Sequence, residues 1–285
     1  MTSTSLTNQL SLTATESAEA HTLLQRWDAQ QTGYIRHRAE RFATITRVVA
    51  GVVAVDPDAP HHAAAARTPR ILDLAGGPGS LAHSLRAELP DAHVVVADKD
   101  PALLQIATET FAGDTRAEIA AVDLADPSWV SHPAIADTPF DAVVSSTALH
   151  WLQPETLVRV YRTLAEIVRP GGIVLNGDHL SYDAAHEPTL RALAARDDQA
   201  VQAASFAEGA ADGADTWDAW WDAVAAVPRY RDALARRDQV WGEELHVAPP
   251  TVTLEFHLAA LRSAGFRETG TVWRYLDDIV LYAIR

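Results

Sequence analysis

Residues 70–99 read RILDLAGGPGSLAHSLRAELPDAHVVVADK. The apolar run at 71–74 predicts a short strand, and a loop rich in glycine follows it at once. Apolar residues then recur at helical spacing from Ser80, a suitable N-cap, to residue 89. A second apolar run at 93–97 predicts another strand, which ends at Asp98. This order of elements predicts a nucleotide-binding β-α-β unit.

The spacing of the glycines and the acid suits a nucleoside ligand. Glycines permit a tight turn and let a ligand approach main-chain N–H groups at a helix N-terminus. A carboxylate at the end of the next strand can hold two ribose hydroxyls, and Asp98 has that position, nineteen residues after Gly79. For the loop alone, a glycine turn in another doubly wound protein is the alternative interpretation.

From Asp73 onward the loop has the pattern acid-x-Ala-x-Gly-x-Gly. It resembles motif I of the class I S-adenosylmethionine (SAM) methyltransferases, Asp/Glu-x-Gly-x-Gly-x-Gly, with Ala75 at the first glycine. Dinucleotide enzymes use Gly-x-Gly-x-x-Gly instead. The resemblance implies that SAM is the cofactor. In this part of the chain it implies a cofactor site made of Asp73, Ala75, Gly76, Gly77, Pro78, Gly79, Asp98 and Lys99.

A third predicted strand, at 117–122, ends at Asp123 and Leu124. In the family that the loop resembles, an acid at this point accepts a hydrogen bond from the adenine amine, and the next residue packs on the ring. The resemblance therefore implies that both residues bind the adenine of SAM. Capping of the turn that follows is the alternative role for Asp123.

A fourth predicted strand, FDAVVSS, ends at Ser146 and is followed by LHWL from Leu149. This sequence resembles motif IV of the same family, where the strand end faces the methyl donor. The resemblance implies that Ser145 and Ser146 lie beside the cofactor. His150 and Trp151 become candidates for substrate binding, with packing of this segment on the sheet as the alternative.

Apolar residues at intervals of three and four predict two helices between residues 21 and 55, with Gly33 as the break between them. In many small-molecule methyltransferases such a segment folds over the cofactor, so Tyr34 and Arg38 are candidates to contact the methionine end of SAM. Helix packing and a solvated arginine are the alternative. We expect residues 1–20 to be a disordered tail and residues 21–69 to be a helical cap and linker.

The sequence Asn-Gly-Asp-His ends at His179 and follows the apolar run of a fifth strand. Ligands of open α/β sheets bind outside such strand ends, so His179 is the candidate general base. Asp178 is predicted to orient it or to contact a cationic substrate. A histidine that only hydrogen-bonds the loop is the alternative. The nearby acids and histidines are too loosely spaced to predict a metal site, and we expect none.

Residues 187–237 are rich in alanine, helical in pattern and longer than a crossover requires, which indicates an inserted lid. A tryptophan cluster in this segment can cover a hydrophobic substrate. Packing of the lid on the core is the alternative for these side chains. The substrate candidates in the lid are Trp217, Trp220 and Trp221.

Two apolar runs at 267–275 and 279–285, joined by a short connection, predict a C-terminal hairpin. In class I methyltransferases such a hairpin makes the last strand antiparallel. We therefore expect an α/β fold with a seven-stranded, mostly parallel sheet and helices on both faces. The expected division is a SAM-binding core at 70–180, a helical lid at 181–250, and a final helix and core hairpin at 251–285.

Composition restricts the class of partner. Asp and Glu number 38 against 23 Lys and Arg, and the net charge of −15 argues against a nucleic-acid surface, which depends on clustered basic residues. The absence of cysteine excludes disulfides and thiol nucleophiles. No apolar run reaches about 18 residues and no basic region precedes an apolar one at the N-terminus, so we expect a cytoplasmic protein without a membrane partner.

Together these patterns predict a SAM-dependent methyltransferase that transfers a methyl group to O, N or C of a small molecule. The alternatives are a SAM-utilising enzyme that catalyses cyclisation or elimination, and a non-catalytic SAM-binding protein. An RNA methyltransferase is disfavoured by charge, and a nicotinamide dehydrogenase by the loop and the hairpin. The methyl acceptor stays open, as does the choice between a monomer and a homodimer.

Overall fold

The computed structural model describes residues 12–54, 68–136, 139–207, 214–242, 244 and 247–285. Its centre is a seven-stranded sheet with the order β3-β2-β1-β4-β5-β7-β6, in which only β7 is antiparallel to its neighbours. The predicted fold class and the antiparallel last strand are therefore confirmed. The strands are β1 Arg70–Leu74, β2 His93–Asp98, β3 Ala117–Ala121, β4 Phe140–Ser146, β5 Val168–His179, β6 Glu268–Tyr275 and β7 Asp278–Ile284.

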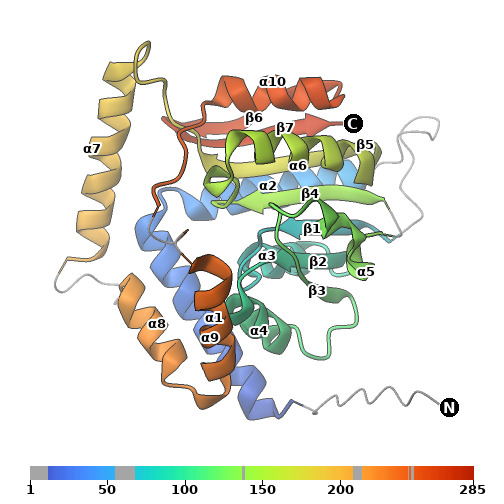
Figure 1. Ribbon diagram of the computed structural model, residues 1–285, viewed down its shortest axis with the longest axis vertical. Helices are drawn as coiled ribbons and strands as arrows, with labels where there is room; N and C mark the ends of the chain where they lie inside the picture. The colour runs from blue at the N-terminus through green and yellow to red at the C-terminus, as the bar shows by residue number, and fades with distance from the viewer. Residues whose placement is uncertain (1–11, 55–67, 137–138, 208–213, 243, 245–246) are drawn as a thin grey trace.

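Helices cover both faces of the sheet (Figure 1). Apolar side chains of α5, α6 and α10 fill one face, and those of α2 and α3 fill the other. No helix of the described residues is both long and apolar enough to cross a membrane. The helices are α1 Ala14–Tyr34, α2 Arg38–Val53, α3 Ser80–Glu88, α4 Pro101–Thr110, α5 Pro133–Ala136, α6 Pro154–Ile167, α7 Pro188–Ser205, α8 Trp217–Ala225, α9 Arg231–Trp241 and α10 Leu254–Ala264.

The parallel register brings the ends of the central strands to one edge of the sheet. Asp73 of β1 lies opposite Val96 of β2 on one side and Val144 of β4 on the other. All three strands run in the same direction, so their carboxyl ends open onto the same side. The polar residues that follow these strands are thereby gathered into one region, which is where open α/β sheets bind ligands.

The chain before β1 is helical from an earlier point than the sequence predicts. Helix α1 begins at Ala14 because Thr13 and Glu16 form a reciprocal capping box, with the Glu16 carboxylate 2.8 Å from the Thr13 amide nitrogen. The expectation of a disordered tail is therefore wrong for residues 14–20. Residues 1–11 of that tail, and 55–67 of the predicted linker, lie outside the described residues.

Helices α7, α8 and α9 come between β5 and α10, as the predicted lid requires. A separate apolar cluster joins this lid to the core: Trp220 and Val224 of α8 pack with Leu23 of α1 and with Leu103 and Ile106 of α4. In Figure 1, α8 and α9 lie beside α1 at one end of the molecule, and α7 stands along its side. The lid is thus attached to α1 and α4 at one side of the sheet.

Helix α10 buries a histidine against α6. The hydroxyl of Tyr161 lies 2.6 Å from Nδ1 of His257, whose side chain is inaccessible to solvent. Burial disfavours the charged imidazolium and lowers the pKa of His257 to about 4. The folded protein therefore holds this histidine neutral at a pH where the unfolded chain protonates it.

We expect His257 to make the protein sensitive to acid. Because the folded pKa is depressed, its contribution to stability is complete above the ordinary value of 6.5 and is lost as the pH falls toward 4. The loss approaches about 3 kcal/mol. Urea unfolding between pH 7.5 and 4 should show a smaller loss of free energy for His257→Phe than for the wild type. Equal losses in the two proteins would contradict the assignment.

Candidate functional site

The loop between β1 and α3 needs glycine at two of its positions. A Cβ atom at Gly76 would lie 2.8 Å from Cγ of Asp73, and one at Gly79 would lie 2.6 Å from the ring of Phe111. Gly79 also has a φ of +91°, which side chains rarely adopt. Ala75, at the first glycine of the motif, has a φ of +53° and is therefore held in a left-handed conformation that glycine adopts freely.

Two buried acids flank this loop. Oδ2 of Asp73 accepts a hydrogen bond from the Ala82 amide at 2.9 Å, and so caps the first turn of α3. The Asp98 carboxylate accepts from the amides of Gly77 and Asp100, both at 2.8 Å. Burial raises the pKa of Asp73 to about 7 and that of Asp98 to about 6. The loop and the second strand are thus held together by the acid that the sequence assigns to the ribose.

The residues at these strand ends fit SAM. Oδ1 of Asp73 and Oγ of Ser145 are buried and have no hydrogen-bond partner among the described atoms. Such groups are costly unless a ligand or water satisfies them. They lie near the ends of the neighbouring strands β1 and β4, where Asp73 faces α3 and Ser145 faces the opposite side of the sheet. A ligand with ribose hydroxyls and an amino acid moiety supplies the hydrogen-bond partners that this region requires.

Other predicted cofactor residues already have protein partners. Asp123 accepts from the Ala125 amide at 2.8 Å, so it caps the turn as the alternative suggested, and Leu124 beside it is buried. Arg38 is buried, and its guanidinium donates to Asp28 at 2.7 Å. Lys99 forms an ion pair with Glu244. Contacts of these side chains with SAM stay predictions.

The pairing of acids and histidines near the end of β5 differs from the prediction. Nδ1 of His179 lies 2.7 Å from Oδ1 of Asp278, whereas Oδ1 of Asp178 lies 2.7 Å from Nδ1 of His150. Asp178 also accepts from the amide of His150 at 3.1 Å. The prediction that Asp178 orients the His179 ring is therefore wrong. Contact of the buried Asp178 carboxylate with a cationic substrate stays a prediction.

The geometry of the sheet explains why His179 pairs with Asp278 and Asp178 pairs with His150. Successive residues of a strand point to opposite faces, so Asp178 and His179 cannot both aim at one target. Antiparallel β7 places Asp278 directly opposite His179. Burial of Asp178 opposes its ionisation, but the neighbouring charges of His150, His179 and Arg41 outweigh burial and hold its pKa well below the ordinary range. In return, Asp178 raises the pKa of His150 although that ring is itself largely buried.

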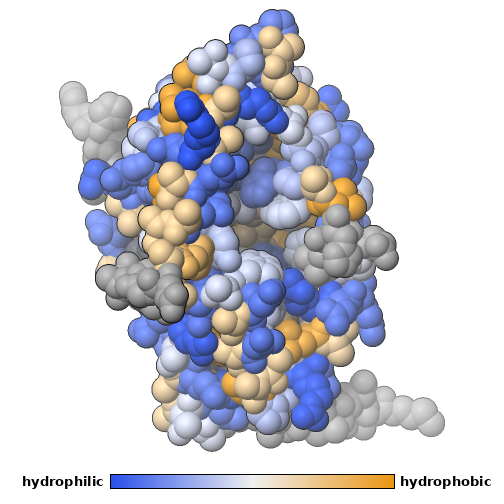
Figure 2. Space-filling view, turned by 90° about the vertical axis from the view of Figure 1, so that its left-hand side faces the viewer, coloured by the Kyte–Doolittle hydropathy of each residue, from blue (hydrophilic) through white to orange (hydrophobic). Residues whose placement is uncertain are grey.

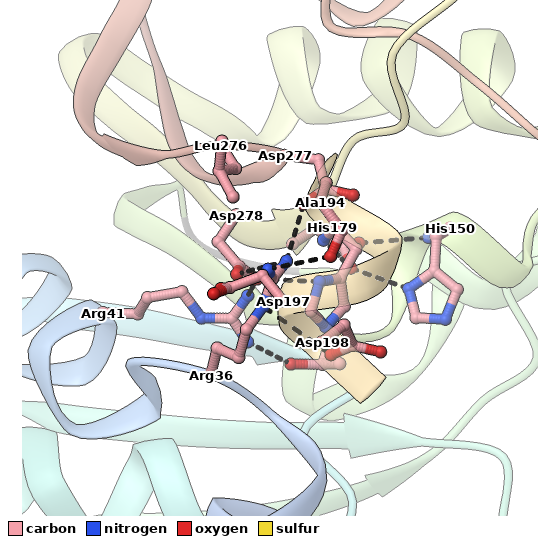
Figure 3. Close-up of polar contacts among 12 residues, drawn as sticks. Arg36, Arg41, His150, His179, Ala194, Asp197, Asp198, Leu276, Asp277 and Asp278 are labelled. Atoms are coloured by element: carbon pink, nitrogen blue, oxygen red, sulfur yellow. Dashed lines mark hydrogen bonds and ion pairs between the residues drawn. The ribbon is translucent and has the colours of Figure 1, made fainter. Parts of the chain in front are cut away.

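Two buried arginines that the sequence did not single out complete this cluster (Figure 3). Arg36 donates to Asp277 at 2.6 Å and lies 2.9 Å from Asp278, both in the hairpin. Its other terminal nitrogen contacts Asp197 of α7 at 3.0 Å. Arg41 lies 3.3 Å from Asp278 and donates to Thr147 Oγ1 at 2.9 Å. Arg36 thus ties the hairpin to the lid, and Arg41 ties the hairpin to the end of β4.

A cavity of about 400 Å³ adjoins this cluster. Its wall includes His179, Tyr34 and Arg191, together with residues of α7 and the hairpin. Figure 2 views the side of the molecule on which α7 lies in Figure 1, and the surface there is deeply hollowed. The volume suits a small organic molecule. The hydroxyl of Tyr34 accepts from the Trp217 amide at 3.1 Å, so the start of α8 is bound to the end of α1 beside this wall.

The tryptophans of the lid have different environments. Trp220 is fully buried, and its indole N–H donates to the carbonyl of Leu23 at 3.0 Å. The prediction that Trp220 contacts substrate is therefore wrong, because it packs the lid on α1. Trp221 meets Trp220 edge to face at 4.8 Å. Trp217 is 41% exposed and Trp151 is 46% exposed, so both stay candidates for substrate contact.

Within the described ranges, no set of three His, Asp or Glu residues could hold a metal ion.

Comparison with known proteins agrees with the motifs. Residues 71–172 match the methyltransferase domain family. Trans-aconitate 2-methyltransferase of Streptomyces coelicolor is 29% identical over 172 residues, which are 59% of this chain and 50% of that protein. Demethylmenaquinone methyltransferase of Clavibacter sepedonicus is 35% identical over 109 residues, which are 37% of this chain and 39% of that protein. The chain thus matches about half, or less, of the length of these curated relatives.

A solved structure shows that the fold extends beyond the matched domain. The O-methyltransferase family protein from Burkholderia thailandensis superimposes with a TM-score of 0.52 and 16% sequence identity. The superposition covers 95% of this chain and 71% of that one. At this level of identity the likeness concerns the fold alone. The likeness in fold thus reaches beyond residues 71–172.

Proposed function

We propose that this protein methylates a small molecule with SAM, because residues 71–172 match the methyltransferase domain family and the chain has the class I methyltransferase fold. The observation that carries the proposal is the glycine loop held against Asp98, with an unpaired buried oxygen of Asp73 beside it. SAM, when bound there, supplies an electrophilic methyl group. Asp98 would hold the ribose hydroxyls, and Asp123 with Leu124 would hold the adenine.

The acceptor is proposed to bind in the cavity that His179 lines. Nδ1 of His179 lies 2.7 Å from the Asp278 carboxylate, which only accepts hydrogen bonds, so in the proposed mechanism Nδ1 carries the proton and Nε2 is the acceptor. Nε2 can take the proton from an acceptor hydroxyl or amine as that atom becomes a nucleophile. Asp278 then stabilises the imidazolium that forms. Helix α7 and the end of α1, which line this cavity, would align the acceptor and exclude water.

We expect His179→Ala to lower turnover by about 100-fold or more, the usual contribution of a positioned general base. Its affinity for SAM should stay close to that of the wild type, because the Asp98 site is built by other elements. His186→Ala is the matched control, since that ring is 86% exposed and pairs only with Asp183 in the described structure. Turnover is measured on an acceptor found by screening. Unchanged turnover in His179→Ala would remove this residue from the mechanism.

The experiment that tests the proposed activity is transfer of the SAM methyl group to a panel of small hydroxyl and amine compounds. Methylation increases the product mass by one methylene, whereas cyclisation or elimination does not. Release of S-adenosylhomocysteine together with that mass increase supports the proposal. If SAM binds and neither product forms with any acceptor class, a non-catalytic binding role becomes the better account.

We propose further that the protein acts in the cytoplasm without a nucleic-acid or membrane partner, either as a monomer or as a homodimer. The net charge of −15 supports the absence of a nucleic-acid partner, because phosphate backbones repel acidic surfaces. A gel shift with RNA at low salt tests it, and binding there would contradict it. Sedimentation equilibrium decides the oligomeric state.

A further inference from the structure

Helix α9 of the lid contacts the residue two positions after Asp98. Nε of Arg237 and Nε1 of Trp241 each donate a hydrogen bond to Oδ2 of Asp100 at 2.8 Å. The Asp100 side chain is 1% exposed, so its charge is removed from water and depends on these partners. A helix that the sequence assigns to substrate covering is therefore bound to the second strand end of the cofactor site, and it lies against α4 there (Figure 1).

Asp100 also contacts Asp98 and so connects α9 to it. Its amide donates to Oδ1 of Asp98 at 2.8 Å, while the Gly77 amide donates to the other oxygen. The second oxygen of the Asp100 carboxylate caps α4, with 2.9 Å to the Ala102 amide. Asp100 is thus held on one side by α4 and on the other by α9. The orientation of the Asp98 carboxylate follows from the position of Asp100.

Further contacts hold α9 in this place. The guanidinium of Arg237 lies 4.0 Å above the ring of Trp221 in α8. Nζ of Lys99 lies 4.0 Å above the ring of Trp241 and pairs with Glu244, just beyond α9. Lys99 and Asp100, the two residues after Asp98, therefore both have partners at the end of α9. Stacking of cations on these rings stabilises the docked position of the helix.

We propose that Arg237 and Trp241 are positioning residues for the cofactor, which hold Asp100 so that the Asp98 carboxylate is fixed for the ribose of SAM. This inference rests on the proposed function, since it takes SAM as the ligand of Asp98. The Arg237 guanidinium also offsets the charge of Asp100, and without it that charge would disfavour the charged form of Asp98. Cofactor affinity then depends on the contacts of α9 with Asp100.

The test is calorimetric titration of the full chain with S-adenosylhomocysteine. Arg237→Gln should weaken binding about tenfold, and Trp241→Phe, which keeps an aromatic ring but removes the N–H donor, about threefold to tenfold. Stopped-flow displacement should show that the ligand leaves each variant faster by a similar factor. Arg236→Gln is the matched control, because Arg236 is the neighbouring arginine of α9 and is exposed. It should bind as the wild type does.

A double-mutant cycle separates positioning from a general effect on folding. If Arg237 acts through Asp98, Arg237→Gln should change affinity by less than twofold when Asp98→Asn is already present. A tenfold change in that background, or no change in the single variants, would overturn the inference. Failure of the wild type to bind S-adenosylhomocysteine would instead overturn the proposed function. If Arg237→Gln shows no thermal unfolding transition, the variant is not folded. The Trp241→Phe variant and its double-mutant cycle with Asp98→Asn then test the inference.

Discussion

Replacement of Asp98 by Asn should weaken SAM binding by about 100-fold, or about 3 kcal/mol, because two charge-assisted hydrogen bonds to the ribose lose their ionised acceptor. The side chain keeps its size, but its NH2 group takes the place of one oxygen, so either the Gly77 or the Asp100 amide loses its acceptor and this loss adds to the effect. Calorimetric titration measures the effect. Asp91→Asn is the control, because Asp91 lies just before β2, at the opposite end of that strand, and its side chain is 84% exposed.

The same variant should remove a pH dependence of binding. Burial raises the pKa of Asp98 to about 6, so the free protein protonates this acid as the pH falls below that value. Ribose hydroxyls favour the ionised form, so SAM affinity should be full above pH 7 and should fall below pH 6. Asp73, whose pKa is raised to about 7, and Asp100 face the same carboxylate and stay in both proteins. An unchanged pH profile in Asp98→Asn would contradict the assignment.

Replacement of Arg36 by Met should lower the free energy of unfolding by about 3 to 5 kcal/mol. The Arg36 side chain is 2% exposed and contacts Asp277, Asp278 and Asp197, and its loss leaves the buried Asp278 carboxylate without one of its two arginine partners. Arg36→Lys should restore only part of the stability, since one ammonium cannot reach partners on both the hairpin and α7. Urea unfolding followed by circular dichroism measures these differences.

Arg26→Met is the matched control for Arg36→Met. Arg26 also pairs with an acid, Asp215, at 2.7 Å, but its side chain is 41% exposed, so removal should cost less than about 1 kcal/mol. Equal losses of unfolding free energy in the two variants would contradict the claim that the buried ion pairs of Arg36 stabilise the protein more than an exposed pair does. Arg36→Met should also lower turnover, because Asp278 then loses the partner that holds it opposite His179.

The fold and the glycine loop could be predicted because their signals are local. Gly76 is required by the close approach of Asp73, Gly79 by its positive φ, and Asp98 ends its strand, so all three can be recognised from neighbouring residues. The hairpin is equally local, since β6 and β7 flank a two-residue turn. Such features need no knowledge of which distant segments meet.

The acceptor side could not be predicted in the same way. The partner of His179 is Asp278, about a hundred positions away in the chain, and only the antiparallel register of β7 brings them together. In the sequence, Asp178 is the nearer acid and therefore the natural but wrong choice. Arg36 has no local signal of burial, because its neutralising acids lie in α7 and the hairpin. Trp220 shows the same limit, since the helical pattern does not reveal which ring faces α1.

The central claim is that the glycine loop and Asp98 bind SAM, and calorimetric titration of the wild type with SAM, S-adenosylhomocysteine and NAD in parallel tests it most directly. The structure predicts saturable binding of the first two ligands and none of NAD, since the loop is of the motif I type and the sheet ends in an antiparallel hairpin. Binding of NAD alone, or of none of the three, would contradict the account.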